Sequence, residues 1–351
     1  MKYSLVIFSF LFLIIFTFSS TAQETAKANK GEGVLQFLKR FNRTKSFHFD
    51  RFIELNRDKL DKNNGLKLGV TYSLPPLNNE GNEPLFGEKL AKYTIDSDEL
   101  NGACFYLVSG HGGPDPGAIG ELRGHPLHED EYAYDIMLRL ARNLMSKGAK
   151  VHIIIQDAKD GIRNDKFLDI SDRETCMGQV IPLNQVKRLQ QRCDKINELF
   201  KKDKEHYRRA LFIHLDSRSE SKQIDVFFYH YDGSAKGKHL ANTLQNVFNR
   251  KYDKHQPLRG FSGTVSPRDL FVIKQSLPVA VFVELGNIQN SQDQQRFLLD
   301  DNRQALANWM CEGLIEDYKN YKMVNTTEHM NLTAEYAKEM GLEPYYLYRQ
   351  K

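Results

Sequence analysis

The stretch Gly110-His111-Gly112-Gly113-Pro114-Asp115-Pro116-Gly117-Ala118-Ile119-Gly120 directly follows an apolar run, Ala103 to Val108. The run has the composition of a buried β-strand, and the glycines after it let backbone approach a ligand or an ion closely. Binding sites of open α/β sheets form at the carboxyl ends of strands. The pattern therefore predicts a functional loop that carries His111, with a tight turn and an incidental histidine as the alternative.

Apolar runs alternate with segments of helical periodicity in the rest of this region. The strand-like runs are 103–108, 150–155, 210–214, 223–229 and 278–284, and the helix-like segments are 132–146, 183–200, 238–248 and 293–318. Short apolar strands that alternate with helices indicate a buried, mostly parallel sheet. We predict an α/β domain over residues 100–318, a mostly parallel sheet flanked by helices. Residues 157–182 show no clean period and are expected to be a surface insertion.

The N-terminus has the pattern of a secretory signal. Lys2 precedes an almost unbroken apolar run over residues 3–18, and small residues follow at 19–22. The run is short for a bilayer span, which needs roughly 17 to 25 residues. We predict a cleaved signal peptide over residues 1–22 and export to a periplasm or to the medium, with an uncleaved membrane anchor as the alternative.

A compact unit is expected at residues 30–76. It has a helix-like stretch at Val34–Phe41, a second at Phe52–Asn56, and strand-like residues that end in Leu74-Pro75. This order resembles the LysM module, a small α+β fold that binds peptidoglycan and chitin; a helical prodomain is the alternative. Residues 77–99 are rich in Pro, Asn, Gly and acidic residues and are expected to form a linker. Residues 319–351 are expected to form a C-terminal tail.

Composition excludes some classes of function. The chain has 351 residues and a net charge of +4, with no basic stripe interleaved with aromatic residues, so no nucleic-acid partner is expected. The four cysteines show no framework spacing and no Cys-x-x-Cys, which argues against a thiolate zinc site. Cys104 lies in an apolar run and is expected to be a small core residue.

Three polar residues stand where apolar runs end. His111, His214 and Glu284 each close a predicted strand, and Glu129 precedes a predicted helix. In a parallel sheet the strand ends meet at one edge. Two histidines, a carboxylate and an open position make a catalytic zinc site, and a further carboxylate can accept a proton. An acidic residue such as Glu129 is also favoured electrostatically at a helix N-terminus, which is its structural alternative.

Several motifs occur in a set order. They are His111 to Gly120, Glu129 ahead of Leu138-Arg139-Leu140-Ala141, Gly148-Ala149-Lys150-Val151, Phe212-Ile213-His214, and Pro278 with Val283-Glu284-Leu285-Gly286-Asn287. Together they resemble the zinc N-acetylmuramoyl-L-alanine amidases of the Amidase_3 type over residues 100–318. The resemblance implies one Zn²⁺ per chain, held by His111, Glu129 and His214, with Glu284 as the catalytic residue. It also implies cleavage of the amide between N-acetylmuramic acid and L-alanine in peptidoglycan.

The chain departs from that family after the second zinc histidine. Leu215-Asp216-Ser217 stands where a small residue and asparagine are usual, which puts the lip of the substrate groove in doubt. The insertion at 157–182 is a candidate for self-inhibition or for contact with a protein activator. A monomer is expected.

Two other functions remain open from the sequence. His128 and Glu131 have the His-x-x-Glu spacing of zinc carboxypeptidases, with His214 as a third ligand. A catalytically inactive protein that binds the cell wall is the other alternative, although the complete set of four residues argues against it.

Overall fold

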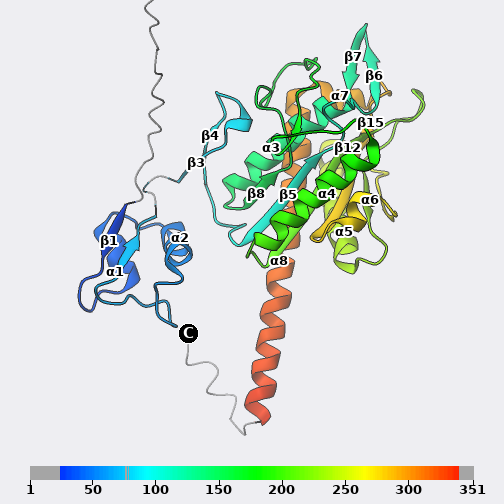
Figure 1. Ribbon diagram of the computed structural model, residues 1–351. Coiled ribbons are helices and arrows are strands. Elements are labelled where there is room, and N and C mark those ends of the chain that lie inside the picture. Colours follow the sequence, from blue (N-terminus) through cyan, green and yellow to red (C-terminus); the bar gives the residue numbers. More distant parts are fainter. Residues whose placement is uncertain (1–23, 76, 78, 340–351) are drawn as a thin grey trace, which may run out of the picture. The chain divides into compact units, whose positions relative to one another are not determined.

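The chain folds into two compact units, one up to residue 78 and one from residue 79 onward. The computed structural model describes residues 24–75, 77 and 79–339 (Figure 1). The predicted signal peptide, residues 1–22, lies outside the described residues. Within the described part of the chain, no helix combines the length and the apolar character needed to span a bilayer.

The first unit pairs two helices with a two-stranded antiparallel sheet. Its elements are β1 (Thr25–Lys27), α1 (Val34–Arg40), α2 (Ser46–Asn56) and β2 (Thr71–Ser73). Phe37, Phe52 and Tyr72 are fully buried, with ring centroids 5.4 to 5.9 Å apart. This aromatic cluster gives the unit a hydrophobic core of its own. The unit is thus small and α+β, and its LysM-like identity stays a prediction.

The second unit is built on a six-stranded sheet with the order β14-β13-β15-β12-β5-β8. These strands are β5 (Ala103–Ser109), β8 (Lys150–Ile153), β12 (Tyr207–Asp216), β13 (Phe227–His230), β14 (Thr264–Pro267) and β15 (Val279–Asn287). All neighbouring strands of this sheet run parallel except β13 and β15. The mostly parallel sheet predicted from the sequence is confirmed.

Helices cover both faces of the sheet (Figure 1). They are α3 (Glu129–Ser146), α5 (Ala235–His255), α7 (Gln294–Leu298) and α8 (Asp300–Glu339) on one side, and α4 (Gln185–Lys202) and α6 (Phe271–Gln275) on the other. Strand side chains alternate between the faces. Phe105 and Leu107 therefore join the core under α3, α5 and α8, whereas Cys104 and Tyr106 join the core under α4 and α6. Burial on both faces explains the continuous apolar run of β5.

The predicted linker is wrong for residues 79–99. This segment contains β3 (Glu80–Asn82), the 3-10 helix η1 (Pro84–Phe86) and β4 (Lys92–Thr94), and β3 pairs with β4. Phe86 is 1% exposed and belongs to the core under α3. The Pro and Gly residues of the segment thus mark turns within the second unit.

The segment 157–182 is packed against the rest of the unit, contrary to the expectation of a surface insertion. It carries β10 (Thr175–Cys176) and β11 (Gln179–Val180), and β10 pairs with β9 (Ile155–Gln156). Leu168 and Cys176 are buried, and the carboxylate of Glu174 accepts a hydrogen bond from the backbone of Gly113 at 2.8 Å. The segment therefore supports the glycine-rich loop.

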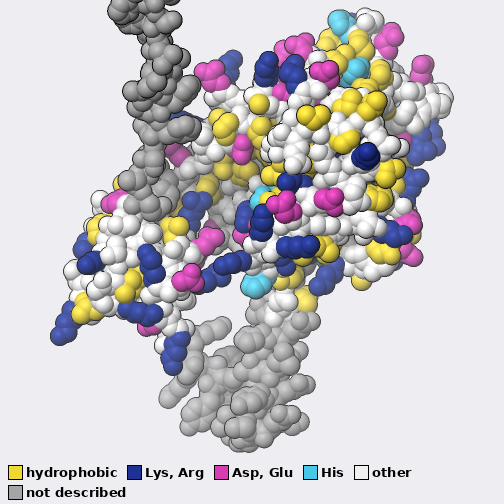
Figure 2. All heavy atoms as spheres, in the orientation of Figure 1, with side chains coloured by type: hydrophobic (Ala, Val, Ile, Leu, Met, Phe, Trp, Pro, Cys, Tyr) yellow, Lys and Arg dark blue, Asp and Glu magenta, His cyan; other side chains and the backbone are white. Residues whose placement is uncertain are grey.

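The region expected as a tail starts inside a helix. α8 runs without a break from Asp300 to Glu339 and buries residues up to Tyr318, and its C-terminal half extends away from the sheet (Figure 1). On the face of the second unit drawn in Figure 2, positive and negative side chains are interspersed. That mixture agrees with the absence of a basic stripe in the sequence.

Candidate active site

His111, Glu129 and His214 come together at the carboxyl edge of the sheet. Nε2 of His111 lies 3.2 Å from Oε2 of Glu129, and Nδ1 of His214 lies 2.8 Å from Oε1 of the same carboxylate. One ligand atom from each residue lies within 4.8 Å of the other two. Two imidazoles and a carboxylate at this spacing are a donor set that suits zinc.

The glycine-rich loop brings His111 into the group through an unusual backbone. His111 has a φ of +56°, and Gly112 and Gly113 follow with φ of +94° and +62°. Such left-handed conformations are costly for residues other than glycine. At Gly117, a Cβ atom would lie 2.6 Å from Cδ2 of His111 and 2.7 Å from Oε2 of Glu129. The loop thus needs glycine both to turn and to pass close to the two side chains.

Glu129 is the first residue of α3 and is held from two sides. Its Oε2 accepts the backbone N–H of Ala118 at 2.9 Å, and its Oε1 accepts the backbone N–H of Leu215 at 3.1 Å. The side chain is buried, with 3% of the residue exposed. These bonds fix the carboxylate between the two histidines.

His214 and Glu284 lie on neighbouring strands in direct register. β12 and β15 pair His214 with Glu284, and the His214 ring stacks on Phe282 at 4.2 Å between centroids. Just beyond this pair β15 carries one residue more than β12, and Gly286 in this bulge has a φ of +145°. The register places the catalytic candidate beside the second histidine.

Burial and neighbouring charges shift the pKa values of the site. Burial raises the pKa of Glu284 well above its ordinary value, and the carboxylates of Glu129 and Asp216 raise it further. Burial also lowers the pKa of His214, which the hydrogen bond to Glu129 only partly offsets. For Glu129, burial acts to raise the pKa, but the hydrogen bonds with His111 and His214 hold it below its ordinary value.

Asp115 orients His111, a role that the sequence did not suggest. Oδ2 of Asp115 lies 2.8 Å from Nδ1 of His111 and 2.5 Å from Nη2 of Arg188 in α4. The bond to His111 lowers the pKa of Asp115 to about 2. Arg192, also in α4, donates to the backbone oxygen of His111. The spacing of four residues between His111 and Asp115 could have suggested their contact. No pattern in the sequence indicates that α4 packs against this loop.

The site opens into a cavity of about 340 Å³. The catalytic candidates His111, Glu129, His214 and Glu284 all line it. Its other walls include Arg188 and Arg192 of α4, Leu270, Phe271 and Val272 before and in α6, and Asp216 and Ser217 at the end of β12. Asp216 and Ser217, which depart from the amidase pattern, therefore do reach the site. None of the described residues of 157–182 lines the cavity. The segment therefore forms no wall of the cavity, and self-inhibition through it stays a prediction.

The arrangement does not support the His-x-x-Glu alternative. Glu131 groups with Asp130 and Glu174 rather than with His214, and Arg163 forms an ion pair with it at 2.9 Å. Among the described residues, His214 shares a group that can hold a metal with His111 and Glu129, and His128 is in none.

Comparison with solved structures gives weak likenesses. They include the N-acetylmuramoyl-L-alanine amidase AmiC2 of Nostoc punctiforme (19% identity, 63% of this chain, 99% of that chain, TM-score 0.45). The CwlD amidase of Clostridioides difficile in complex with the GerS lipoprotein is 18% identical (62% and 98% covered, TM-score 0.45). The catalytic domain of CwlV, an amidase from Bacillus (Paenibacillus) polymyxa var. colistinus, is 19% identical (62% and 98% covered, TM-score 0.45). No curated protein matches the chain.

The family assignment rests on sequence. The pattern of the Amidase_3 family, described as N-acetylmuramoyl-L-alanine amidase, matches residues 106–316, which is more than half of the chain. The match contains the four residues that the fold brings to one cavity. The chain therefore belongs to the Amidase_3 family of N-acetylmuramoyl-L-alanine amidases.

Proposed function

We propose that the protein is an exported, zinc-dependent hydrolase that cleaves the amide between the lactyl group of N-acetylmuramic acid and L-alanine in peptidoglycan. The observation that supports this most is the convergence of His111, Glu129 and His214 beside a fourth, half-buried side chain, Glu284. The alternative of an inactive wall-binding protein has less support, because all four residues are present and face one cavity.

The donor set fits a zinc ion. Nδ1 of His111 faces the carboxylate of Asp115, so Nε2 is left to face Glu129 and bind a metal. A carboxylate behind a metal-binding histidine fixes its tautomer and orientation. The glycine at 110 keeps space beside His214, because a Cβ there would lie 2.4 Å from the imidazole. His111, Glu129 and His214 would hold the ion.

When bound, zinc supplies a Lewis acid that polarises the amide carbonyl and lowers the pKa of water. Glu284 is the general base of the proposal. Its Oε2 is buried and has no hydrogen-bond partner among the described residues, so it is free to accept the proton of the attacking water. Its raised pKa makes it a stronger base than an exposed glutamate.

Glu284 then passes the proton to the nitrogen of L-alanine as the C–N bond breaks. The water oxygen ends in the new lactyl carboxylate, and the peptide leaves with a free amine. Phe282 stacks on His214 and restricts rotation of its ring during these steps.

The proposal extends to the N-terminal unit and to location. We propose that residues 24–75 bind peptidoglycan in the manner of a LysM module, which their separate aromatic core supports. Export to the periplasm or the medium follows from the signal-like residues 1–22 and from a substrate that lies outside the cytoplasm.

Digestion of purified sacculi tests the reaction. Wild type is expected to release stem peptides that begin with L-alanine, identified by mass, and a metal chelator is expected to stop this until zinc is restored. Glu284→Gln removes the base and is expected to lower kcat by about 10² to 10⁴ while the zinc content stays unchanged. Exposed Glu88→Gln is the matched control. Wall binding without peptide release at any zinc concentration would refute the proposal.

A further inference from the structure

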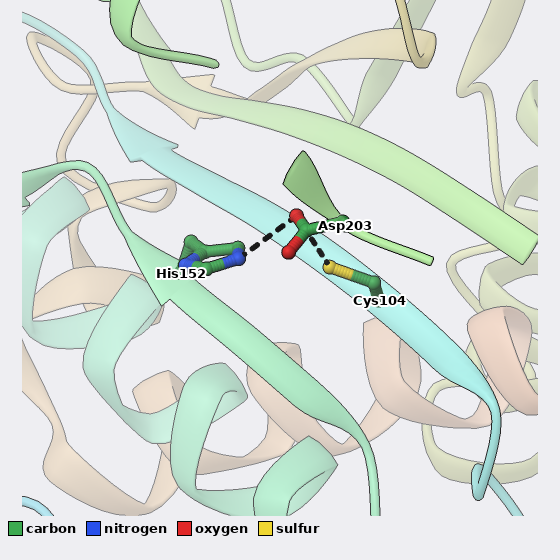
Figure 3. Close-up of side chains that lie close together, drawn as sticks. All are labelled: Cys104, His152 and Asp203. Atoms are coloured by element: carbon green, nitrogen blue, oxygen red, sulfur yellow. Dashed lines mark hydrogen bonds and ion pairs between the residues drawn. The ribbon is translucent and has the colours of Figure 1, made fainter. Parts of the chain in front are cut away.

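A second cluster of metal-ligand residues lies near the amino-terminal end of β5, whereas the active site lies beyond the carboxyl end of that strand. Cys104 stands at the start of β5, His152 is in β8, and Asp203 caps the C-terminus of α4 (Figure 3). One ligand atom from each lies within 4.8 Å of the others. We propose that these three side chains form a binding site for a divalent transition-metal ion such as Zn²⁺, separate from the active site.

The fold places the three side chains together. β5 and β8 are parallel neighbours with Cys104 opposite Lys150 and Tyr106 opposite His152. Alternation along each strand puts these side chains on the face covered by α4. The C-terminal end of that helix then brings Asp203 over them. No local motif in the sequence unites the ligands, because they come from three separate segments.

The distances agree with one ion between the ligands. Oδ2 of Asp203 lies 3.5 Å from Sγ of Cys104 and 3.0 Å from Nε2 of His152. Tetrahedral zinc with ordinary bond lengths separates a sulfur ligand from an oxygen ligand by about 3.6 Å, and a nitrogen ligand from an oxygen ligand by about 3.4 Å. An ion therefore requires only small side-chain shifts.

Without an ion, one carboxylate oxygen is crowded. Oδ2 of Asp203 faces Cys104, His152 and the hydroxyl of Tyr106, which donates to it at 2.5 Å. A carboxylate oxygen has about two lone-pair sites for these three partners. An ion that takes Sγ, Nε2 and Oδ2 as ligands would resolve this excess and leave the Tyr106 bond in place.

The local charges also favour a divalent ion. Nζ of Lys150 lies 2.7 Å from Asp203 and 3.3 Å from Glu205, so one ammonium faces two carboxylates. On binding, the Sγ–H bond of Cys104 breaks, a Sγ–metal bond forms and the proton leaves to solvent. The thiolate adds a third negative charge, and an ion of charge +2 then brings the total to zero. Sulfur, imidazole and carboxylate ligands together suit Zn²⁺ better than Mg²⁺ or Ca²⁺.

An ion can reach the site from solvent. The Cys104 side chain is fully buried, but the His152 side chain is 17% exposed and that of Lys150 is 44% exposed. Bound there, the ion would tie the edge strand β8 to the end of α4. The role that follows is structural, because the ion would join two separate elements of the fold.

Cobalt binding to the full-length, metal-free protein tests the site. The three ligands proposed for the catalytic zinc include no cysteine, so a thiolate-to-cobalt charge-transfer absorption reports a different site, whether or not the proposed reaction is correct. Of the cysteines among the described residues, Cys104 is the one that belongs to a group able to hold a metal. Wild type is expected to develop this absorption with the intensity of one Co²⁺ bound at this site, beyond any Co²⁺ at the catalytic site, and Zn²⁺ is expected to displace it. Absence of the absorption at saturating cobalt would overturn the proposal.

Variants make the test specific. Cys104→Ser is expected to abolish the absorption, whereas Cys193→Ser, which alters another fully buried thiol on the same face of the sheet, is expected to retain it. His152→Gln keeps the thiol and is expected to weaken cobalt binding by at least about tenfold. Loss of a residue that only supports a metal ligand already costs about tenfold in affinity, so loss of a ligand costs at least as much. An absorption that survives Cys104→Ser would show that another cysteine binds the cobalt and would refute the site. A cobalt affinity unchanged by His152→Gln would refute it as well.

Discussion

Replacement of Asp115 by asparagine perturbs the zinc ligand His111 without replacing any of the proposed ligands. Oδ2 of Asp115 holds Nδ1 of His111 at 2.8 Å and Nη2 of Arg188 at 2.5 Å. Asparagine keeps the volume and one acceptor oxygen, but it loses the negative charge. His111 is then less firmly held with Nε2 toward Glu129, and zinc affinity is expected to fall.

The size of the effect follows from the contacts. A hydrogen bond to a charged group contributes about 1.5 to 3 kcal/mol. The Asp115 side chain is 24% exposed, so water screens part of the interaction and the lower end applies. About 1.5 kcal/mol corresponds to roughly tenfold in zinc affinity, at the low end of the 10- to 100-fold seen for residues behind metal ligands.

Recovery of activity in the metal-free protein, measured against buffered free zinc, gives the affinity of the catalytic site alone. Asp115→Asn is expected to need about tenfold more free zinc than wild type, and to reach near wild-type activity at saturation. Exposed Asp165→Asn is the matched control. A recovery curve that coincides with that of wild type would refute the orienting role of Asp115.

Other perturbations have equally direct outcomes. Gly110→Ala places a Cβ 2.4 Å from the His214 ring, so zinc content and activity are expected to fall together, and full zinc occupancy would contradict the close approach. Arg303→Met removes a fully buried guanidinium 2.6 Å from Asp135 and is expected to lower the free energy of unfolding by about 3 kcal/mol in urea denaturation; an unchanged midpoint would contradict this. A protein without residues 24–75 is expected to cleave soluble muropeptides as wild type does and to lose sacculus binding in pull-down; retained binding would assign wall recognition to the second unit.

The sequence allowed prediction of the residues whose positions depend on strand ends. His111, His214 and Glu284 each follow or close a buried run, and parallel strands bring such positions to one edge. Asp115 and its partner Arg188 were not predicted as a pair. They are 73 residues apart, and their contact depends on how α4 packs over the loop, which neither hydrophobic periodicity nor spacing encodes.

The polar composition of residues 157–182 led to the wrong prediction of a surface insertion. The segment is rich in charged residues, a composition typical of solvated loops, yet several of those charges pair with buried partners. Arg163 forms ion pairs with Glu131 and Asp160 at 2.9 and 3.0 Å, and the hydroxyl of Ser171 donates to Asp157 at 2.9 Å. A single sequence does not distinguish a charge that meets water from one that meets an opposite charge in the interior.

The bulge beyond His214 and Glu284 marks the point where the strict register between β12 and β15 ends. Up to Glu284 every residue of β15 has a fixed partner in β12, so inserting or deleting one residue in 279–284 would turn the Glu284 side chain to the opposite face. After Gly286 the strand has already absorbed one extra residue. Beyond the bulge Asn287, Ile288 and Asn290 are buried and hydrogen-bonded, so specific polar contacts take over there from strand register.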